Sequence, residues 1–158
     1  EPVAMQIFVS SLFFRLCNAV FALLIPVCVI AQPDVSHRQG DYEVYYSAFN
    51  TSFLKADVAR AVGVVRAADR GLLNISVLQH SDTGSNNVPA RVTGESYDLL
   101  HRKTLAFKEI AEPGARYYIS PFKISNDNEM IVFDIVVKPE NSNKEISFQF
   151  KRRLFQNP

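Results

Sequence analysis

A short run in the first half of the chain places two arginines around one aspartate, Arg66-Ala-Ala-Asp69-Arg70. The planar guanidinium group binds carboxylates and phosphates through paired hydrogen bonds, so these arginines could form a site for an anion. The same side chains could instead form an ion pair that fixes a loop. We treat Arg66, Asp69 and Arg70 as a candidate binding site.

A second group of candidates consists of tyrosines in two separate runs and one asparagine. Alternation along a strand sends some of the rings outward, where tyrosine often takes part in recognition. Packing at the edge of a sheet is the commoner role, because tyrosine is usually part-buried. The candidates are Tyr45, Tyr46, Tyr117 and Tyr118, with Asn74 on the mixed face of another strand.

The residues that could ligate a metal or catalyse a reaction are dispersed. His37, His80 and His101 fall in a linker and two turns, and no pair has the spacing of metal ligands. The sequence contains no phosphate-binding loop, dinucleotide fingerprint or nucleophile elbow. We therefore expect no metal, no cofactor and no catalytic residue.

The elements that must position these residues follow from an alternation of period two. The run 70–78 is the clearest example, with Leu73, Ile75 and Val77 on one face. We place this strand at the centre of the fold. The run 130–138 gives the strongest strand pattern in the second half.

Seven or eight such runs, separated by short polar turns, predict an all-β fold. We expect an antiparallel immunoglobulin-like β-sandwich over residues 41–155, with one short helical turn over residues 57–62. Asp57 is expected to cap that turn and Gly63 to end it. The predicted core consists of Val44, Leu73, Ile75, Val77, Val92, Phe107, Phe133, Ile135, Phe148 and Phe150.

Several segments depart from simple alternation. Residues 80–87 are polar and predict a loop, and a strand is expected to resume near Val64. Gly94 predicts a bulge or a close backbone contact. Residues 103–110 predict one strand with a bulge, because Phe107 and Ile110 fall out of phase.

The N-terminal residues differ from the rest. Residues 16–31 carry no charge, Arg15 precedes them, and Val29 and Ala31 supply small residues before Gln32. We expect a signal peptide over residues 1–31 and a linker over residues 32–40. An uncleaved membrane anchor is the alternative. Cys17 and Cys28 are the only cysteines and both lie in this leader, so cleavage would leave a domain without thiols.

Three blocks in the mature region resemble a bacterial family known only as domain of unknown function 4426. They are Gly40 to Leu54 (GDYEVYYSAFNTSFL), Asp57-Val-Ala with Gly63 to Arg66, and Asp69 to Val77, followed by Val92-Thr-Gly94 and Tyr117-Tyr-Ile119. The resemblance extends from about residue 40 to residue 155. It implies export in a gammaproteobacterium and supplies no activity or catalytic residue.

These observations together favour a non-enzymatic binding or assembly module of the Gram-negative cell envelope, located in the periplasm. Its expected partner is another envelope protein, and the alternative to a periplasmic location is an inner-membrane anchor. The formal charge of +1 indicates no nucleic-acid partner. The competing function is an envelope hydrolase that uses the dispersed carboxylates Asp41, Glu43 and Asp69, one of which would need a raised pKa inside a cleft.

Overall fold

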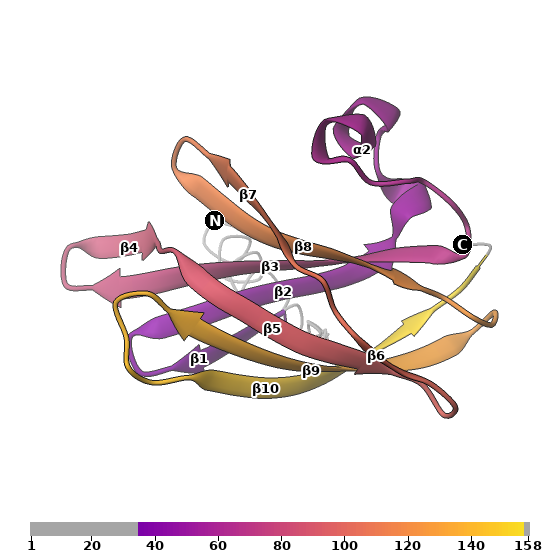
Figure 1. The fold of residues 1–158 in the computed structure, drawn as a ribbon. Helices are drawn as coiled ribbons and strands as arrows, with labels where there is room; N and C mark the ends of the chain where they lie inside the picture. Colours follow the sequence, from indigo (N-terminus) through magenta and orange to yellow (C-terminus); the bar gives the residue numbers. More distant parts are fainter. Residues whose placement is uncertain (1–34, 157–158) are drawn as a thin grey trace, which may run out of the picture. The chain divides into compact units, whose positions relative to one another are not determined.

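The computed structural model of the chain describes residues 35–156, so the predicted leader lies outside the described residues. Residues 34–158 form a compact unit. Two antiparallel sheets pack face to face in this unit, with one short α-helix (Figure 1). The prediction of an antiparallel all-β sandwich with one helical turn is confirmed.

The first sheet has the order β1-β2-β3-β8-β7, and β4 pairs with the far part of β3. Its strands are β1 (Ser36–Gln39), β2 (Tyr42–Asn50), β3 (Arg70–Ser81), β4 (Gly84–Asn87), β7 (Lys108–Glu112) and β8 (Ala115–Lys123). The second sheet has the order β10-β9-β5-β6. Its strands are β5 (Ala90–Tyr97), β6 (Arg102–Thr104), β9 (Glu129–Pro139) and β10 (Ile146–Leu154).

Strand β3 is the centre of the first sheet, as the sequence predicts. It pairs with β2 along one side and with β8 and β4 along the other. Leu73, Ile75 and Val77 point into the sandwich and are completely buried. The alternating pattern therefore identifies both the strand and the face that contacts the core.

Aromatic rings fill the middle of the core. Phe133 on β9 stacks on Phe150, with ring centroids 4.9 Å apart, and meets Phe122 edge to face at 5.0 Å. Seven of the ten predicted core residues are buried, namely Val44, Leu73, Ile75, Val77, Val92, Phe133 and Ile135. The other three, Phe107, Phe148 and Phe150, are partly buried and pack against the core.

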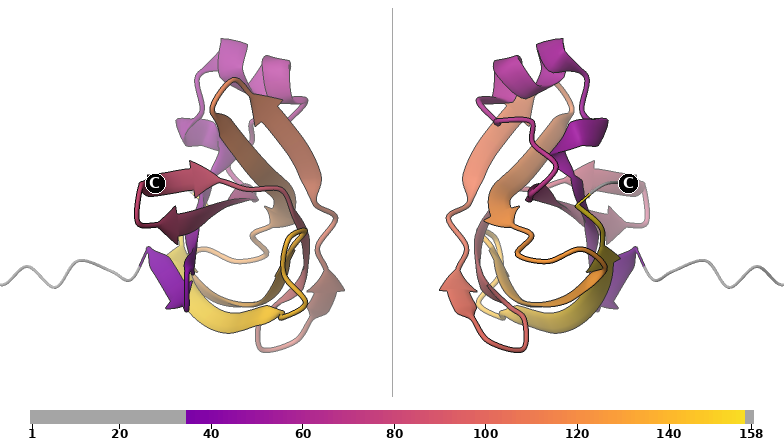
Figure 2. Two further views of the ribbon diagram at one scale, coloured as in Figure 1. Left: turned by 90° about the vertical axis from the view of Figure 1, so that its left-hand side faces the viewer. Right: turned by 90° about the vertical axis from the view of Figure 1, so that its right-hand side faces the viewer.

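A helical excursion separates β2 from β3. It contains the 3-10 helix η1 (Thr51–Phe53) and the α-helix α2 (Ala56–Val62), which stands out from the sandwich beyond the end of β2 (Figures 1 and 2). Gly63 ends α2 as predicted, because its φ of 74° is the left-handed conformation that glycine favours. Asp57 does not cap the helix; the N-cap is Lys55, and Asp57 lies in the first turn.

Two segments predicted as irregular form strands. The polar run 80–87 forms the hairpin of β3 and β4, and the predicted linker contains β1. Both strands carry polar residues on both faces at the rim of the sheet, so they lack the apolar alternation that reveals a half-buried strand. His37 and His80 consequently lie in strands, whereas His101 lies in a turn as expected.

The opposite error occurs near residues 64 and 103–110. No strand is assigned in residues 64–69 of the described chain, and the predicted strand 103–110 divides into β6 and β7. The chain leaves the second sheet after β6 and joins the first sheet as β7. The break in apolar phase at Phe107 marks this crossing rather than a bulge.

Gly94 allows β5 to approach β9 closely. The pairing remains in register through Gly94 and Ile135, so there is no bulge here in the described structure. A Cβ atom at residue 94 would lie 2.5 Å from the Asp134 carbonyl oxygen and 2.8 Å from Cδ1 of Ile135. Of the two alternatives, the close backbone contact is confirmed.

Within the described residues, no helix has the length and apolar character needed to cross a bilayer.

Candidate functional site

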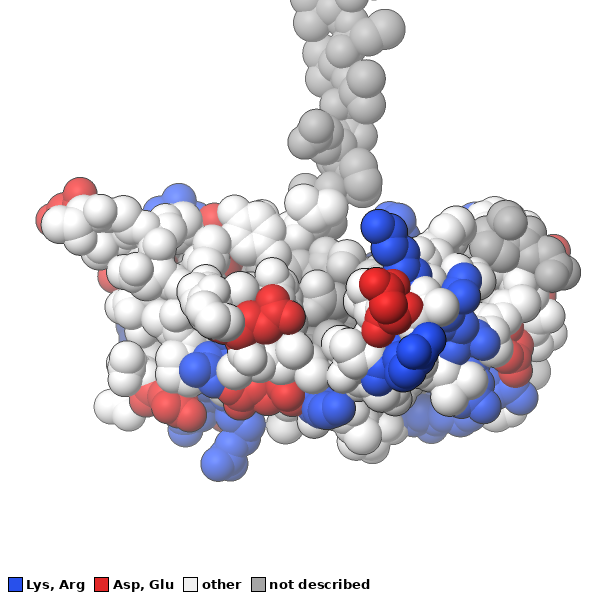
Figure 3. Space-filling view, turned by 90° about the horizontal axis from the view of Figure 1, so that it is seen from above, with Lys and Arg blue, Asp and Glu red and all other residues white. Residues whose placement is uncertain are grey.

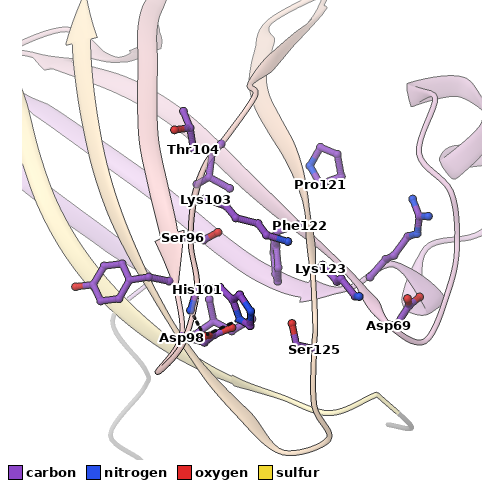
Figure 4. Close-up of a pocket in the computed structure, with 14 residues that line it drawn as sticks. Asp69, Ser96, Asp98, His101, Lys103, Thr104, Pro121, Phe122, Lys123 and Ser125 are labelled. Atoms are coloured by element: carbon purple, nitrogen blue, oxygen red, sulfur yellow. Dashed lines mark hydrogen bonds and ion pairs between the residues drawn. The ribbon is translucent and has the colours of Figure 1, made fainter.

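A pocket of about 460 Å³ lies between residues of the first sheet and residues of the second. Strand β6 pairs with β5 in the second sheet, and β8 pairs with β3 and β7 in the first sheet. In the described structure, β6 and β8 are therefore not paired with each other. The walls are the ends of β5 and β6, the end of β8 and the residues that open β3 (Figure 4). The pocket therefore takes residues from both sheets.

The rim of this pocket carries three cationic side chains from three strands. They are Arg70 on β3, Lys103 on β6 and Lys123 on β8. Figure 4 shows Lys103 and Lys123 lining the opening from opposite walls. Across residues 35–156, none of these side chains takes part in a described hydrogen bond or ion pair, so all three are available to an anion.

The floor of the pocket is mainly apolar. Leu105, Phe122 and Ile131 line it and are buried, and Ser96 contributes the only buried hydroxyl among the described lining residues. An apolar floor below polar groups is the usual composition of a small-molecule site. The arrangement suits a ligand with an anionic group and a hydrophobic part.

The two lining carboxylates differ in their surroundings. Asp69 has no described side-chain partner among residues 35–156, whereas Asp98 is tied into the β5–β6 turn. Its Oδ1 accepts hydrogen bonds from the backbone N–H groups of Leu100 at 2.6 Å and His101 at 2.7 Å. The bond from Leu100 lowers the pKa of Asp98 most, and the His101 backbone and side chain lower it further. Asp98 thus acts as a fixed anion that shapes the turn.

The arginine-flanked run is divided by the structure. Asp69 and Arg70 both line the pocket, and of the two only Arg70 carries the charge that would attract an anion. Arg66 is not among the lining residues; its Nη2 donates to the carbonyl of Ser52 at 3.0 Å and so holds the loop after β2. Arg66 therefore fixes a loop through a backbone carbonyl rather than through the predicted ion pair, and the anion site at Arg70 stays a prediction.

The tyrosines do not form one surface. Tyr46 stacks on Phe150 with a centroid distance of 4.4 Å and so packs against the core. Tyr118 is buried, and its hydroxyl accepts a 2.7 Å hydrogen bond from the Ala90 backbone N–H, which links the two sheets. Tyr45 is exposed on the outer face, where its hydrogen bond to Glu43 raises the pKa of the phenol.

The remaining candidates lie on the outer face of the first sheet, away from the pocket lining. Asn74 pairs with Ser47 on β2 and with Ile119 on β8, and its Oδ1 is buried without a partner in the described structure. Tyr117 is half-buried on β8, opposite Ile110 on β7. Neither residue is near enough to Arg70 to line the same cavity.

The cationic residues Lys103 and Lys123 were not among the sequence candidates. They are distant in sequence, and single lysines on short strands resemble any solvated lysine. A local signal was available only for Arg70, because an aspartate and a second arginine stand beside it. Bringing residues 70, 103 and 123 together requires the strand order of both sheets.

A second polar cluster links three strands on the outer face of the first sheet. Nε2 of His80 lies 2.8 Å from Oε2 of Glu43, and Nδ1 of His80 lies 2.7 Å from the Ser85 hydroxyl. Hydrogen bonds from Ser36 and then His80 lower the pKa of Glu43, against a smaller effect of burial. We refer to Glu43, His80 and Ser85 as the relay. The sequence does not reveal the relay, because the polar run that contains His80 predicts a turn rather than paired strands.

Within the described residues, no group of three or more His, Cys, Asp or Glu side chains could hold a metal ion. Lys and Arg are interspersed with Asp and Glu over the face shown in Figure 3, so this face lacks a field of one sign.

Comparison with known proteins identifies relatives of uncharacterised function. Residues 36–157 match the family model described as Domain of unknown function (DUF4426). A crystal structure of a DUF4426 family protein from Pseudomonas aeruginosa PAO1 is similar, with 36% identity and a TM-score of 0.65. The match covers 76% of this chain and 93% of that chain. No curated protein matches.

Proposed function

We propose that this chain, which belongs to the DUF4426 family, is a binding module of the Gram-negative cell envelope whose pocket takes an anionic amphiphile. The observation that carries this proposal is the combination of three unpaired cations, Arg70, Lys103 and Lys123, with an apolar floor. An anion there would form charge-assisted hydrogen bonds, which are about twice as strong as neutral ones. The envelope location is inferred from the leader pattern in the sequence.

The positions of the carboxylates favour binding over acid–base catalysis. Asp69 lines the pocket, whereas Asp41 and Glu43 do not. Glu43 has a lowered pKa and so stays ionised, which is the opposite of what a general acid needs. The three carboxylates of the competing hydrolase hypothesis thus do not converge on one cleft.

The test is calorimetric titration of residues 34–158 with octyl phosphate, using octyl glucoside as the neutral probe. We expect octyl phosphate to bind and the double variant Lys103→Gln/Lys123→Gln to weaken it about tenfold or more, because each lost charged hydrogen bond contributes about 1.5–3 kcal/mol. Lys138→Gln/Lys151→Gln is the matched control, since it removes the same charge from exposed lysines outside the pocket. If both double variants lost the same affinity for octyl phosphate, binding would not depend on the pocket lysines and the proposed site would be contradicted.

The relay supports a second candidate function, that of a serine hydrolase. Ser85, His80 and Glu43 would take the roles of nucleophile, base and orienting carboxylate, because His80 lies within hydrogen-bond distance of both other residues. A fluorophosphonate probe discriminates between the two functions. Labelling that is lost in Ser85→Ala and retained in Ser81→Ala would favour the hydrolase, whereas an unlabelled protein agrees with the binding module.

A further inference from the structure

The turn between β5 and β6 carries two adjacent leucines that face solvent. Leu99 is 101% exposed and Leu100 is 82% exposed, the highest values among the large apolar residues of the described chain. Two neighbouring leucines at one tip remove more apolar surface from water, when covered, than scattered single residues do. We call residues 98–101 the leucine tip.

The leucine tip is held in shape by the hydrogen bonds of Asp98. The backbone N–H of Asp98 donates to the His101 carbonyl at 3.0 Å, and its side chain accepts from Leu100 and His101. These bonds close the turn independently of either leucine side chain. A partner that covers the tip therefore meets a preorganised surface and pays little ordering entropy.

One aromatic and several cationic side chains flank the leucine tip along the β5–β6 hairpin, and the Tyr97 hydroxyl accepts a hydrogen bond from Gln149 on β10. The Arg102 guanidinium lies 4.4 Å from the centroid of the Tyr97 ring and forms an ion pair with Glu95 at 2.6 Å. His101 and Lys103 are exposed beside it, and Lys123 lies across the pocket. The nearby carboxylates Glu95 and Asp98 both have partners within the hairpin, whereas Lys103 has none among the described residues.

We propose that the leucine tip docks the domain on a bilayer that contains anionic lipids, with Leu99 and Leu100 in the acyl region. Amphipathic tyrosine suits the interface between acyl chains and headgroups, and lysine and arginine suit the lipid phosphates. Two side chains are too few to form the core of a stable protein interface, which buries about 1,200 Å² or more. This inference does not depend on which ligand occupies the pocket.

The experiment uses a tryptophan as a local reporter, because the natural sequence contains none. Leu99→Trp is compared with Phe53→Trp. Phe53 is also an exposed apolar residue, but it lies far from the leucine tip along the chain. Both are made in residues 34–158, so the apolar leader is absent. With vesicles of phosphatidylglycerol and phosphatidylcholine, we expect a blue shift of emission and quenching by brominated lipid for Leu99→Trp only.

Binding strength gives an independent measure. In vesicle co-sedimentation, we expect Leu99→Ser/Leu100→Ser to weaken binding at least tenfold while Phe53→Ser does not, with unchanged thermal midpoints for both. Pure phosphatidylcholine vesicles should bind the parent protein weakly. Equal spectra at positions 99 and 53, or sedimentation unaffected by the leucine changes, would overturn the proposal. A blue shift at position 99 that appears without lipid and increases with protein concentration would also overturn the proposal. It would indicate that the leucine tip contacts a second copy of the chain.

Discussion

At the scale of single residues, the alternation of apolar and polar side chains decides which positions are critical for stability. Phe133 is fully buried between Phe122 and Phe150, so its ring cannot be removed without leaving a void. The partly buried Phe148 stacks on His37 at the open side of the core. These environments predict different costs for the same substitution.

We predict that Phe133→Ala lowers the free energy of unfolding by about 3–5 kcal/mol, the usual cost of removing a buried aromatic ring. Phe155→Ala is the control. Its ring is exposed, so removing it should change the free energy of unfolding little. Urea denaturation followed by circular dichroism measures both. Equal midpoints for the two variants would show that β9 has been assigned the wrong inward face.

The relay predicts a dependence of stability on pH. Hydrogen bonds from Ser36 and His80 hold the pKa of Glu43 below its ordinary value of 4.5. A carboxylate with a depressed folded pKa contributes stability that is fully present above the unfolded pKa and is lost as pH falls through the folded pKa.

We therefore expect the parent protein to lose more stability than Glu43→Gln between neutral pH and a pH well below 4.5. Urea midpoints at the two pH values measure the difference. Asp82→Asn serves as the control, since Asp82 is an exposed carboxylate in the β3–β4 turn. Identical pH dependence in the parent and Glu43→Gln would show that the relay does not stabilise the fold.

At the scale of elements, the pairing of β5 with β9 depends on a missing side chain. A methyl group at residue 94 would meet the Asp134 carbonyl and the Ile135 side chain, so the strands would have to separate. The backbone N–H of Leu105 also donates to the Gly94 carbonyl, which connects this position to the wall of the pocket.

Gly94→Ala should therefore destabilise the domain by about 1–3 kcal/mol, the usual cost of overpacking. It should also weaken octyl phosphate binding by moving β6. Thr93→Ala, at the exposed neighbouring position on β5, is the matched control and should do neither. A Gly94→Ala variant with the parent's thermal midpoint would contradict the close contact.

At the scale of the whole molecule, the domain and the leader have separate roles in the proposal. The domain supplies the pocket and the leucine tip, and the sequence pattern over residues 16–31 predicts export. A periplasmic location would bring the domain to a membrane surface without an anchor. The alternative, an uncleaved anchor, would hold it there permanently.

We expect mass spectrometry of the protein isolated from a Gram-negative host to show an N-terminus at Gln32, after the Val29–Ala31 cleavage pattern. The osmotic-shock fraction should contain the protein. Ala31→Arg, which removes the small residue before the cleavage site, should leave the leader attached. Recovery of the intact parent chain from the inner membrane would favour the anchor.

The sequence by itself determined the features that depend on local periodicity. The alternation in β3 and β9 identified strands, inward faces and most of the core, because every second side chain of a strand faces the same way. The end of α2 at Gly63 followed from the left-handed conformation that glycine favours, whereas Gly94 indicated only a bulge or a close contact, and the structure decided for the contact. The run from Arg66 to Arg70 also indicated one wall of the candidate site.

Only the tertiary structure decided what lies opposite that wall. Arg70, Lys103 and Lys123 line one pocket because β6 of the second sheet lies across from β3 and β8 of the first sheet, and no local pattern encodes that arrangement. The relay likewise depends on β4, whose polar residues on both faces conceal it as a strand. Periodicity reports burial, which is a local consequence of the fold, whereas a site depends on distances between segments that are remote in sequence.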